Sequence, residues 1–414
     1  MTATAWRNCR LGDLLEIKHG YAFQGEYFVN TGSHIVLTPG NFYDEGGFKD
    51  KGDKEKWHNG PIPSDYVLNE GDLIVAMTEQ AEGLLGSSAI IPRSGVYLHN
   101  QRLGLVQVRD QSEVDKGFLY YLFNSKPVRQ QIRGSASGTK IRHTAPSRIG
   151  EVKVSVPPLL IQRRIGGILS AYDELIENNQ RRIKILEEMA RSLYREWFVH
   201  FRFPGHEKAK MVPSSLGPIP QGWEVKRVPE CVDITPRVIV PRDGEKPFVP
   251  MGCLSNDSML ISDIESRDGN SGAKFQNGDT LFARITPCLE NGKTGFVQFL
   301  PDEQAVACGS TEFIVLRSRT LTPEIVYLLA RSDEFRRVAI KSMTGATGRQ
   351  RVQEQCFNDF KIAQSPYALL DRFSAIVTPS FRLIYKLHLQ IQNLRCTRDL
   401  LLPRVLSGQV NLLS

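Results

Sequence analysis

The sequence predicts an α+β fold: two tandem mixed α/β domains separated by two long helices that form an antiparallel coiled coil, with an internal pseudo-two-fold repeat. Three observations predict this. Two apolar seams with helical spacing recur along the chain, the segments before them share landmarks, and both segments contain short β-branched runs punctuated by Gly, Pro and Asn. The expected boundaries are a first domain at 1–157, a central helix at 158–203, a second domain at 204–365, and a C-terminal helix with a tail at 366–414.

The two seams repeat every 3.5 residues, which is the spacing that lets one helix pack along another. The expected core positions are Ile165, Leu169, Tyr172, Ile176, Asn179, Ile183, Leu186 and Leu193 in the first helix, and Phe373, Val377, Ile384, Leu387, Ile391, Leu394 and Leu401 in the second. Each residue of the second seam lies 208 positions after a residue of the first. Asn179 either fixes the register of the pair or is a tolerated polar residue near water. Pro379 predicts a kink or a restart in the second helix.

The segments before the seams repeat at a nearly constant offset. Residues 71–76 (Gly-Asp-Leu-Ile-Val-Ala) are echoed by 278–283 (Gly-Asp-Thr-Leu-Phe-Ala), and the apolar run 118–122 by 325–329. Strands are expected at 73–76, 89–91, 105–108, 280–285, 295–300 and 313–316, and helices at 118–123 with its continuation and at 323–340. The pattern is that of loop-rich domains, which usually act by recognition.

Composition is typical of a globular protein, with 41% apolar and 23% charged residues in 414. No apolar run approaches the roughly 20 residues of a membrane span, and the N-terminus lacks the apolar centre of a signal peptide. The seven cysteines form no CxxC pair, which favours buried thiols in a reducing compartment. We therefore expect a cytoplasmic protein without membrane contact.

A net charge of +7 favours a polyanionic partner, and the placement of the cations strengthens this expectation. A Gly/Ser/Thr turn with clustered cations precedes each long helix, at 138–144 and 345–351. Arginine can bridge guanine, and glutamine can bridge adenine, in the major groove. The candidate DNA-binding residues are Lys18, His19, Tyr21, Arg102, Lys140 and Arg142 in the first copy, and Arg237, Arg284, Arg349, Gln350 and Arg351 in the second. The alternative for each is a solvated loop or a strand-end residue held by a carboxylate.

Motifs of catalysis are missing from the sequence. The segment Gly292-Lys293-Thr294 has Pro287 where a P-loop needs glycine, and no NPPY- or DPPY-type tetrapeptide of an amino-methyltransferase occurs. The eight histidines form no HExxH pattern. We therefore predict no catalytic residues, no metal site and no cofactor in this chain.

Several motifs together resemble the specificity subunit of type I restriction–modification systems. The sharpest is 154–165, Val-Ser-Val-Pro-Pro-Leu-Leu-Ile-Gln-Arg-Arg-Ile, which is similar to the start of the central helix of that family. Residues 197–205, 219–223 and the ending 401–408 are also similar to the family. The second helix departs from the pattern, because 364–367 lacks the doubled proline and the Gln-Arg-Arg.

The resemblance implies a non-catalytic subunit that directs its partners to double-stranded DNA. Each domain would be a target-recognition domain for one half of a bipartite target, and the helices would set the half-site spacing and dock two methyltransferase subunits. A motor-endonuclease subunit would complete the complex, with S-adenosylmethionine, ATP and Mg on the partners. Two alternatives remain: a non-catalytic tandem interaction scaffold, and a methyltransferase or nuclease with built-in recognition domains.

Overall fold

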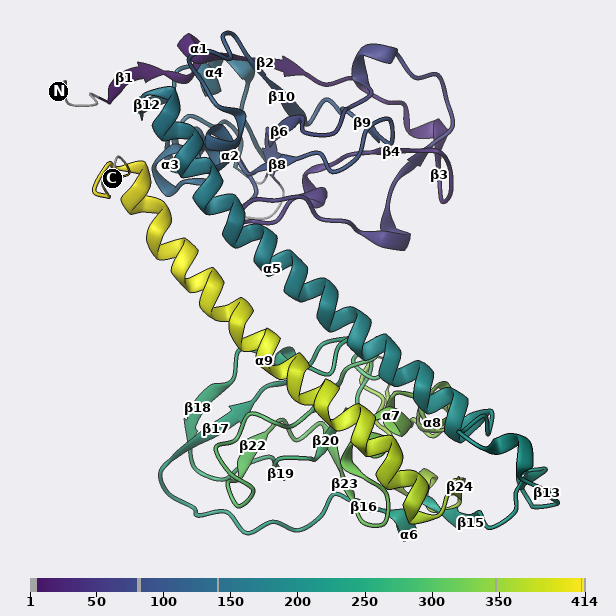
Figure 1. Cartoon of the computed structure of the whole chain (residues 1–414). Helices are drawn as coiled ribbons and strands as arrows, with labels where there is room; N and C mark the ends of the chain where they lie inside the picture. Colours follow the sequence, from purple (N-terminus) through teal and green to yellow (C-terminus); the bar gives the residue numbers. More distant parts are fainter. Residues whose placement is uncertain (1–5, 80–82, 140, 347, 411, 413–414) are drawn as a thin grey trace. The chain divides into compact units, whose positions relative to one another are not determined.

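A computed structural model describes residues 6–79, 83–139, 141–346, 348–410 and 412 of the chain (Figure 1). The chain divides into two compact units. Unit 1 comprises Met1–Leu175 and Asn393–Ser414, and unit 2 comprises Ile176–Gln392. Each unit therefore holds one mixed α/β domain together with a stretch of both long helices. No helix in the described part of the chain is long and apolar enough to cross a membrane.

The main sheet of unit 1 is antiparallel, in the order β2-β10-β6-β8. Its strands are β2 (Leu15–His19), β10 (Leu103–Val108), β6 (Leu73–Ala76) and β8 (Ser88–Ile90). All four residues of β6 are buried, so this strand is the centre of the domain and pairs on both edges. The strands predicted at 73–76 and 105–108 thus lie next to each other in the sheet.

A second sheet, in the order β3-β5-β4-β9, and a two-stranded sheet complete the domain of unit 1. The strands are β3 (Phe28–Val29), β5 (Trp57–His58), β4 (His34–Val36) and β9 (Tyr97–Leu98), with β4 and β9 parallel. The two-stranded sheet pairs β1 (Arg7–Arg10) with β12 (Lys153–Val156), and the short helices α1 (Leu11–Leu14) and α4 (Pro146–Gly150) contact each other beside it.

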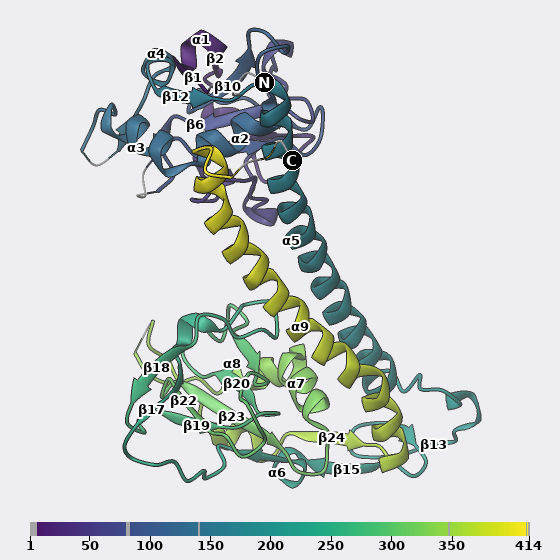
Figure 2. The same ribbon diagram turned by 60° about the vertical axis from the view of Figure 1, so that its left-hand side comes forward.

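Unit 2 repeats this plan. Its main sheet has the order β16-β23-β20-β21, formed by β16 (Val232–Ile234), β23 (Phe313–Ser318), β20 (Thr280–Ala283) and β21 (Thr294–Phe296). The second sheet is β18-β17-β22-β19, formed by β18 (Glu265–Asp268), β17 (Glu245–Val249), β22 (Ala307–Gly309) and β19 (Ala273–Phe275) (Figure 2). The pair β15 (Glu224–Arg227) and β24 (Lys361–Gln364) corresponds to β1 and β12, and α6 (Val228–Cys231) follows β15 as α1 follows β1. Beyond this repeat, β13 (Met211–Val212) pairs with β14 (Ile219–Pro220).

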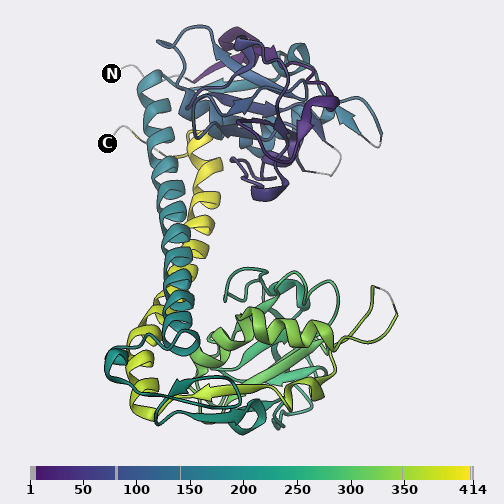
Figure 3. The same ribbon diagram turned by 90° about the vertical axis from the view of Figure 1, so that its right-hand side faces the viewer.

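Each domain carries two consecutive helices, and the single helix expected at 323–340 is wrong. Unit 1 has α2 (Lys116–Asn124) and α3 (Lys126–Gly134), and unit 2 has α7 (Pro323–Arg331) and α8 (Asp333–Lys341). Ser332 separates α7 from α8. Its backbone is extended (ψ 148°), and its hydroxyl accepts the Phe335 N–H at 3.3 Å, which caps α8. The helix α7 packs against the main sheet of its unit (Figure 3).

Strand ends also differ from the expectation in unit 2. Strand β20 ends at Ala283 rather than 285, and β21 covers Thr294–Phe296 rather than 295–300. Beyond Ala283 the chain turns away to form the loop that carries the candidate residue Arg284.

The two long helices are α5 (Leu159–Tyr194), followed by a π-helical turn at Arg195–Val199, and α9 (Tyr367–Leu406). Of the expected core residues, ten are at most 7% exposed: Ile165, Leu169, Ile176, Asn179, Ile183, Phe373, Val377, Ile384, Leu387 and Ile391. The other five, Tyr172, Leu186, Leu193, Leu394 and Leu401, are half-buried.

Pro379 does not interrupt α9, because the helix is continuous from Tyr367 to Leu406. The expected restart is therefore wrong, and the expected kink stays a prediction. Proline removes one N–H, which leaves the carbonyl of Ala375 without its helical donor. Both Pro379 and Ala375 are exposed, so water can satisfy that carbonyl. The buried position nearby is Phe381, which packs against Phe296 and Tyr327.

The helices contact each other within each unit. In unit 1, the Arg398 guanidinium of α9 lies 2.5 Å from the Asp173 carboxylate of α5, which also accepts the Tyr121 hydroxyl of α2 at 2.6 Å. In unit 2, Phe373 of α9 packs edge-on against Trp197, with ring centroids 5.7 Å apart. Within each unit, the stretches of α5 and α9 lie side by side and run in opposite directions (Figures 1 and 3).

Candidate nucleic-acid interfaces

In unit 1, three strand ends that carry candidate residues lie at one end of the main sheet. His19 at the end of β2 pairs with Gly104, and Leu103 at the start of β10 pairs with Ala76 at the end of β6. Lys18 and Arg102, beside these residues, are therefore brought to the same sheet end. The topology thus gathers positions that are separated by more than 80 residues in the sequence.

The cationic turn of unit 1 joins the same sheet end through a short ladder. Strand β7 (Thr78–Glu79) follows β6 and pairs with β11 (Arg142–His143), with Arg142 opposite Glu79. The Thr144 N–H donates to the Met77 carbonyl at 2.9 Å, and the Met77 N–H donates to the Arg102 carbonyl at 2.9 Å. Lys140, also a candidate, lies outside the described residues.

The candidate residues of unit 1 differ in whether their side chains already have partners within the domain. The Lys18 ammonium donates to the Asp65 carbonyl at 2.8 Å and lies 4.7 Å from the Tyr66 ring centroid. Tyr21 is 40% exposed and packs on the same ring, and His19 is exposed. Arg102 and Arg142 are exposed, and neither guanidinium has a hydrogen bond or ion pair among the described residues. These two guanidinium groups are free to meet phosphate or base edges.

In unit 2, the matching loops are joined in the same way. The Arg284 N–H donates to the Glu312 carbonyl at 3.0 Å, and the Val352 N–H donates to the Arg284 carbonyl at 2.8 Å. The backbones of Arg351 and Ile285 form an isolated antiparallel β-bridge, and the Thr286 N–H donates to the Gln350 carbonyl at 3.1 Å. Arg284 thus holds the place of Met77, and the structure brings together Arg284, Gln350 and Arg351.

Two candidate arginines of unit 2 are already paired with carboxylates. Arg351 binds Glu312 with both Nε (2.9 Å) and Nη2 (2.6 Å), and its hydrogen bonds lower the pKa of the Glu312 carboxyl. Arg284 donates to Glu354 at 2.9 Å and to the Val352 carbonyl at 3.1 Å. These two side chains order the loops.

Arg237 and Arg349 are exposed, and their guanidinium groups have no partner among the described residues. Among the candidate arginines of unit 2, they are the ones free to bind a polyanion. Gln350 is half-buried, and its own N–H donates to the Thr286 hydroxyl at 3.1 Å.

Sequence reasoning allowed for arginines held by carboxylates but did not identify the carboxylates that shape both surfaces. Glu79 is buried, accepts the Leu85 N–H at 2.8 Å and so fixes the loop beside Arg142. Glu312 and Glu354 lie 39 and 70 residues from their arginine partners. Because no local spacing links such pairs, the sequence carries no signal for them.

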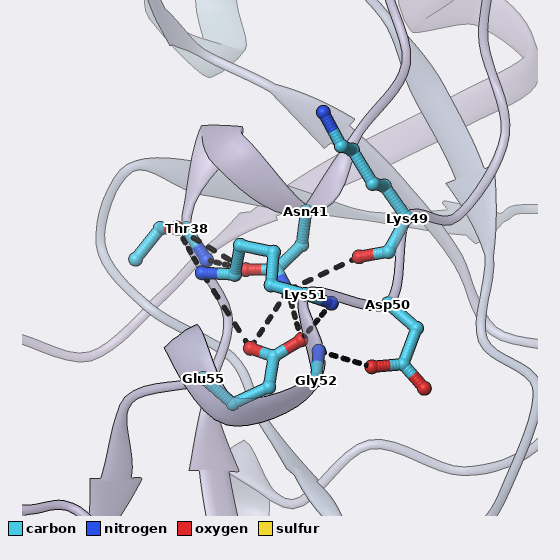
Figure 4. Close-up of polar contacts among 7 residues, drawn as sticks. All are labelled: Thr38, Asn41, Lys49, Asp50, Lys51, Gly52 and Glu55. Carbon is cyan, nitrogen blue, oxygen red and sulfur yellow. Dashed lines mark hydrogen bonds and ion pairs between the residues drawn. The ribbon is translucent and has the colours of Figure 1, made fainter. Parts of the chain in front are cut away.

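A lysine-bearing loop at 38–56 of unit 1 was also missed, because its four lysines alternate with Asp50, Asp53 and Glu55. Two of these acids, Asp50 and Glu55, accept hydrogen bonds from within the loop (Figure 4). The Glu55 carboxylate, 7% exposed, accepts the Asn41 side-chain amide at 2.9 Å and the Lys51 N–H at 2.8 Å. The Asn41 oxygen in turn accepts the Thr38 N–H at 3.0 Å. The network orders the loop and leaves Lys49, Lys54 and Lys56 exposed.

No group of three or more His, Cys, Asp or Glu side chains is placed to hold a metal ion within the part of the chain that the structure describes. Lys293, from the rejected P-loop, donates to the Met251 carbonyl at 2.9 Å and so has a structural contact.

Comparison with known proteins agrees with this arrangement. Residues 4–188 match the family described as "Type I restriction modification DNA specificity domain". The chain is 26% identical over 312 residues to the type I restriction enzyme MjaIX specificity subunit of Methanocaldococcus jannaschii, covering 71% of this chain and 68% of that protein. It is 32% identical over 155 residues to the EcoEI specificity subunit of Escherichia coli, covering 36% of this chain and 26% of that protein.

A solved structure shares the fold. The S subunit of a type I restriction–modification system from M. genitalium aligns with a TM-score of 0.60 at 14% identity, covering 98% of this chain and 97% of that one. The fold is therefore that of two tandem α/β domains with two long helices. Residues 4–188 thus match this specificity domain, and the chain is similar to specificity subunits of type I restriction–modification systems.

Proposed function

We propose that this chain selects the DNA target of a type I restriction–modification complex, with each domain reading one half of a bipartite sequence. The observation that carries the proposal is the matched surface in each unit, where strand-end loops meet a cationic turn. In these turns the guanidinium groups of Arg142 and Arg349 have no partner among the described residues. Such groups suit phosphate contact and guanine recognition. The side chains differ between the copies, with Met77 in the place of Arg284, so the two half-sites differ in sequence.

In this proposal the helices α5 and α9 set the spacing between half-sites and dock two methyltransferase subunits, and a motor-endonuclease subunit completes the complex. The exposed apolar side chains of the helices, such as Leu175 (51%), Met189 (62%) and Ile376 (52%), support docking, because exposed apolar surface favours association. The chain itself is non-catalytic and cytoplasmic, and S-adenosylmethionine, ATP and Mg bind the partners.

A binding selection tests the proposal. The chain, co-expressed with its methyltransferase partner, is incubated with a random duplex library, and bound DNA is sequenced. We expect a motif of two short specific parts separated by a fixed unspecified spacer, with affinity that falls steeply as salt rises. Enrichment of one continuous motif, or of no motif, would contradict the proposal.

A further inference from the structure

In each unit, a partly buried arginine on the second of the two consecutive helices donates to backbone carbonyls of a loop. In unit 1, Arg129 of α3 donates from Nε to the Leu85 carbonyl at 3.0 Å and from Nη1 to the Asp44 carbonyl at 2.9 Å. Its Nη2 donates to the Gly83 carbonyl. One guanidinium group thus joins the loop between β6 and β8 to the lysine-bearing loop at 38–56.

Unit 2 contains the same joint. Arg336 of α8 donates to the Leu289 carbonyl, in the loop between β20 and β21. Arg331 of α7 supplies the link to the second loop, because its Nη1 donates to the Gly292 carbonyl at 2.8 Å and to the Asn256 carbonyl at 3.1 Å. Two arginines here do what Arg129 does alone.

The surroundings of the two joints match as well. Leu85 and Leu289, whose carbonyls are bound, are fully buried. Shortly after each comes a glycine with positive φ, Gly86 at +79° and Gly292 at +97°, a conformation that side chains with a Cβ rarely adopt. Each joint therefore consists of a buried leucine, an arginine that donates to the carbonyl of that leucine, and a glycine turn that follows.

This arrangement is a costly way to gain stability. Neither Arg129 nor Arg336 has a hydrogen bond to a carboxylate among the described residues. Burial lowers the pKa of both, that of Arg129 to about 10, because each charged group loses solvation. The recurrence of the charged group in both copies points to a role in loop geometry.

The loops that these arginines join lie beside the candidate recognition residues. The first loop of unit 1 starts with Thr78 and Glu79, which pair with Arg142 and His143. Its far end is tied to the lysine-bearing loop again, because the Ser87 hydroxyl donates to the Tyr43 carbonyl at 2.7 Å. A change at Arg129 therefore reaches both loops without touching the exposed cations.

We propose that Arg129 and Arg336 are positioning residues for recognition. Arg129 holds two loops of its domain, and Arg336 holds one loop of its domain, in the conformation that reads the half-site of that domain. The proposal rests on the proposed function above. Loops ordered before binding lose less conformational entropy when they meet a rigid duplex, and they discriminate between bases by fixed geometry.

The reciprocal pair Arg129→Gln and Arg336→Gln tests the proposal in the library selection, using the chain with its methyltransferase partner. We expect R129Q to reduce base preference by about 10-fold in one half of the motif and to leave the other half unchanged. R336Q should do the reverse. The matched control is R337Q, on the next, exposed residue of α8, which should leave both halves unchanged.

A second readout follows the loops without DNA. Amide hydrogen exchange should rise in 83–88 and 42–48 for R129Q, with 289–296 unchanged, and the reverse should hold for R336Q. Should R129Q unfold, Arg129→Lys keeps the charge, but its single ammonium cannot take the positions of three guanidinium nitrogens. R129K should then weaken preference in the same half only.

The outcomes separate the two proposals. A wild-type chain that enriches no bipartite motif contradicts the proposed function itself. A bipartite wild-type motif that either variant leaves intact, or erodes equally in both halves, overturns the positioning role of the arginines while the proposed function stands.

Discussion

At the scale of single residues, the free guanidinium groups and the paired ones have different expected roles. Arg142 and Arg349 are exposed without partners among the described residues, whereas Arg351 is held by Glu312 at 2.6 Å. We therefore expect the first two to contact DNA and the third to order its loop.

Replacing Arg142 by Ala should weaken discrimination at one half-site by about 1–3 kcal/mol and leave the other half-site's preference intact. Replacing Arg349 by Ala should affect only the other half. Competition binding with duplexes mutated in one half at a time measures both. Equal loss at both halves for either variant would contradict independent domains.

A buried histidine makes the stability of unit 1 depend on pH. His99 is fully buried, its Nε2 lies 2.9 Å from the Leu103 carbonyl, and burial lowers its pKa to about 4. The unfolded chain binds the proton at its ordinary pKa of about 6.5. The contribution of neutral His99 to the free energy of unfolding is therefore complete above pH 6.5 and is lost as the pH falls from 6.5 to 4.

The size of the effect is at most about 3 kcal/mol, from the difference between the two pKa values. Urea denaturation of the wild type and of His99→Gln across pH 7 to 4 measures it. The wild type should lose more stability over this range than the variant. Parallel pH profiles would show that His99 does not titrate as described.

At the scale of elements, the ion pair between α5 and α9 in unit 1 should contribute to helix pairing. The side chains of Asp173 and Arg398 are 30% and 21% exposed. Burial opposes the charge of Arg398, but Asp173 and Asp399 outweigh it and raise the pKa of the guanidinium. A partly buried pair of this kind lies between the weak surface pairs and the strong buried ones.

A double-mutant cycle of Asp173→Leu and Arg398→Leu should give a coupling energy of about 1–2 kcal/mol in urea denaturation. The control cycle uses Arg395→Leu, an exposed arginine one turn earlier in α9, and should give coupling near zero. Similar values in both cycles would mean that the contact between Asp173 and Arg398 adds no specific stability.

The regular elements could be predicted because their signals are local. The seams of α5 and α9 and the strand at 73–76 follow from periodicity and β-branched runs. At Ser332 one continuous helix was predicted and the structure has two, whereas at Pro379 an interruption was predicted and the helix continues. A serine ended a helix by capping the next one, and a proline was tolerated because its neighbours face water.

The candidate surfaces could be predicted only in part. The cationic turns are visible in the sequence, but the partners of Arg351 and Arg284 depend on how distant strands are ordered in the sheet. The carbonyl contacts of Arg129 and Arg336 leave no trace in residue type, because every residue has a carbonyl.

At the scale of the whole molecule, the proposed role of the helices as a spacer can be tested by shortening both. Removing one heptad from each, residues 176–182 of α5 and 384–390 of α9, keeps both seams in register. The preferred distance between half-sites should fall by roughly 10 Å, or about three base pairs, in the library selection. Removing the heptad from α9 alone should disrupt helix pairing, and an unchanged spacing in the double deletion would contradict the role.

The central claim, that this chain selects the DNA sequence modified by its complex, is tested most directly by methylome sequencing. A host expressing the chain with its methyltransferase partner is compared with the same host lacking the chain. We predict adenine methylation at a two-part motif that disappears when the chain is removed. An identical methylome in both hosts, with the methyltransferase shown to be expressed and active, would contradict the claim.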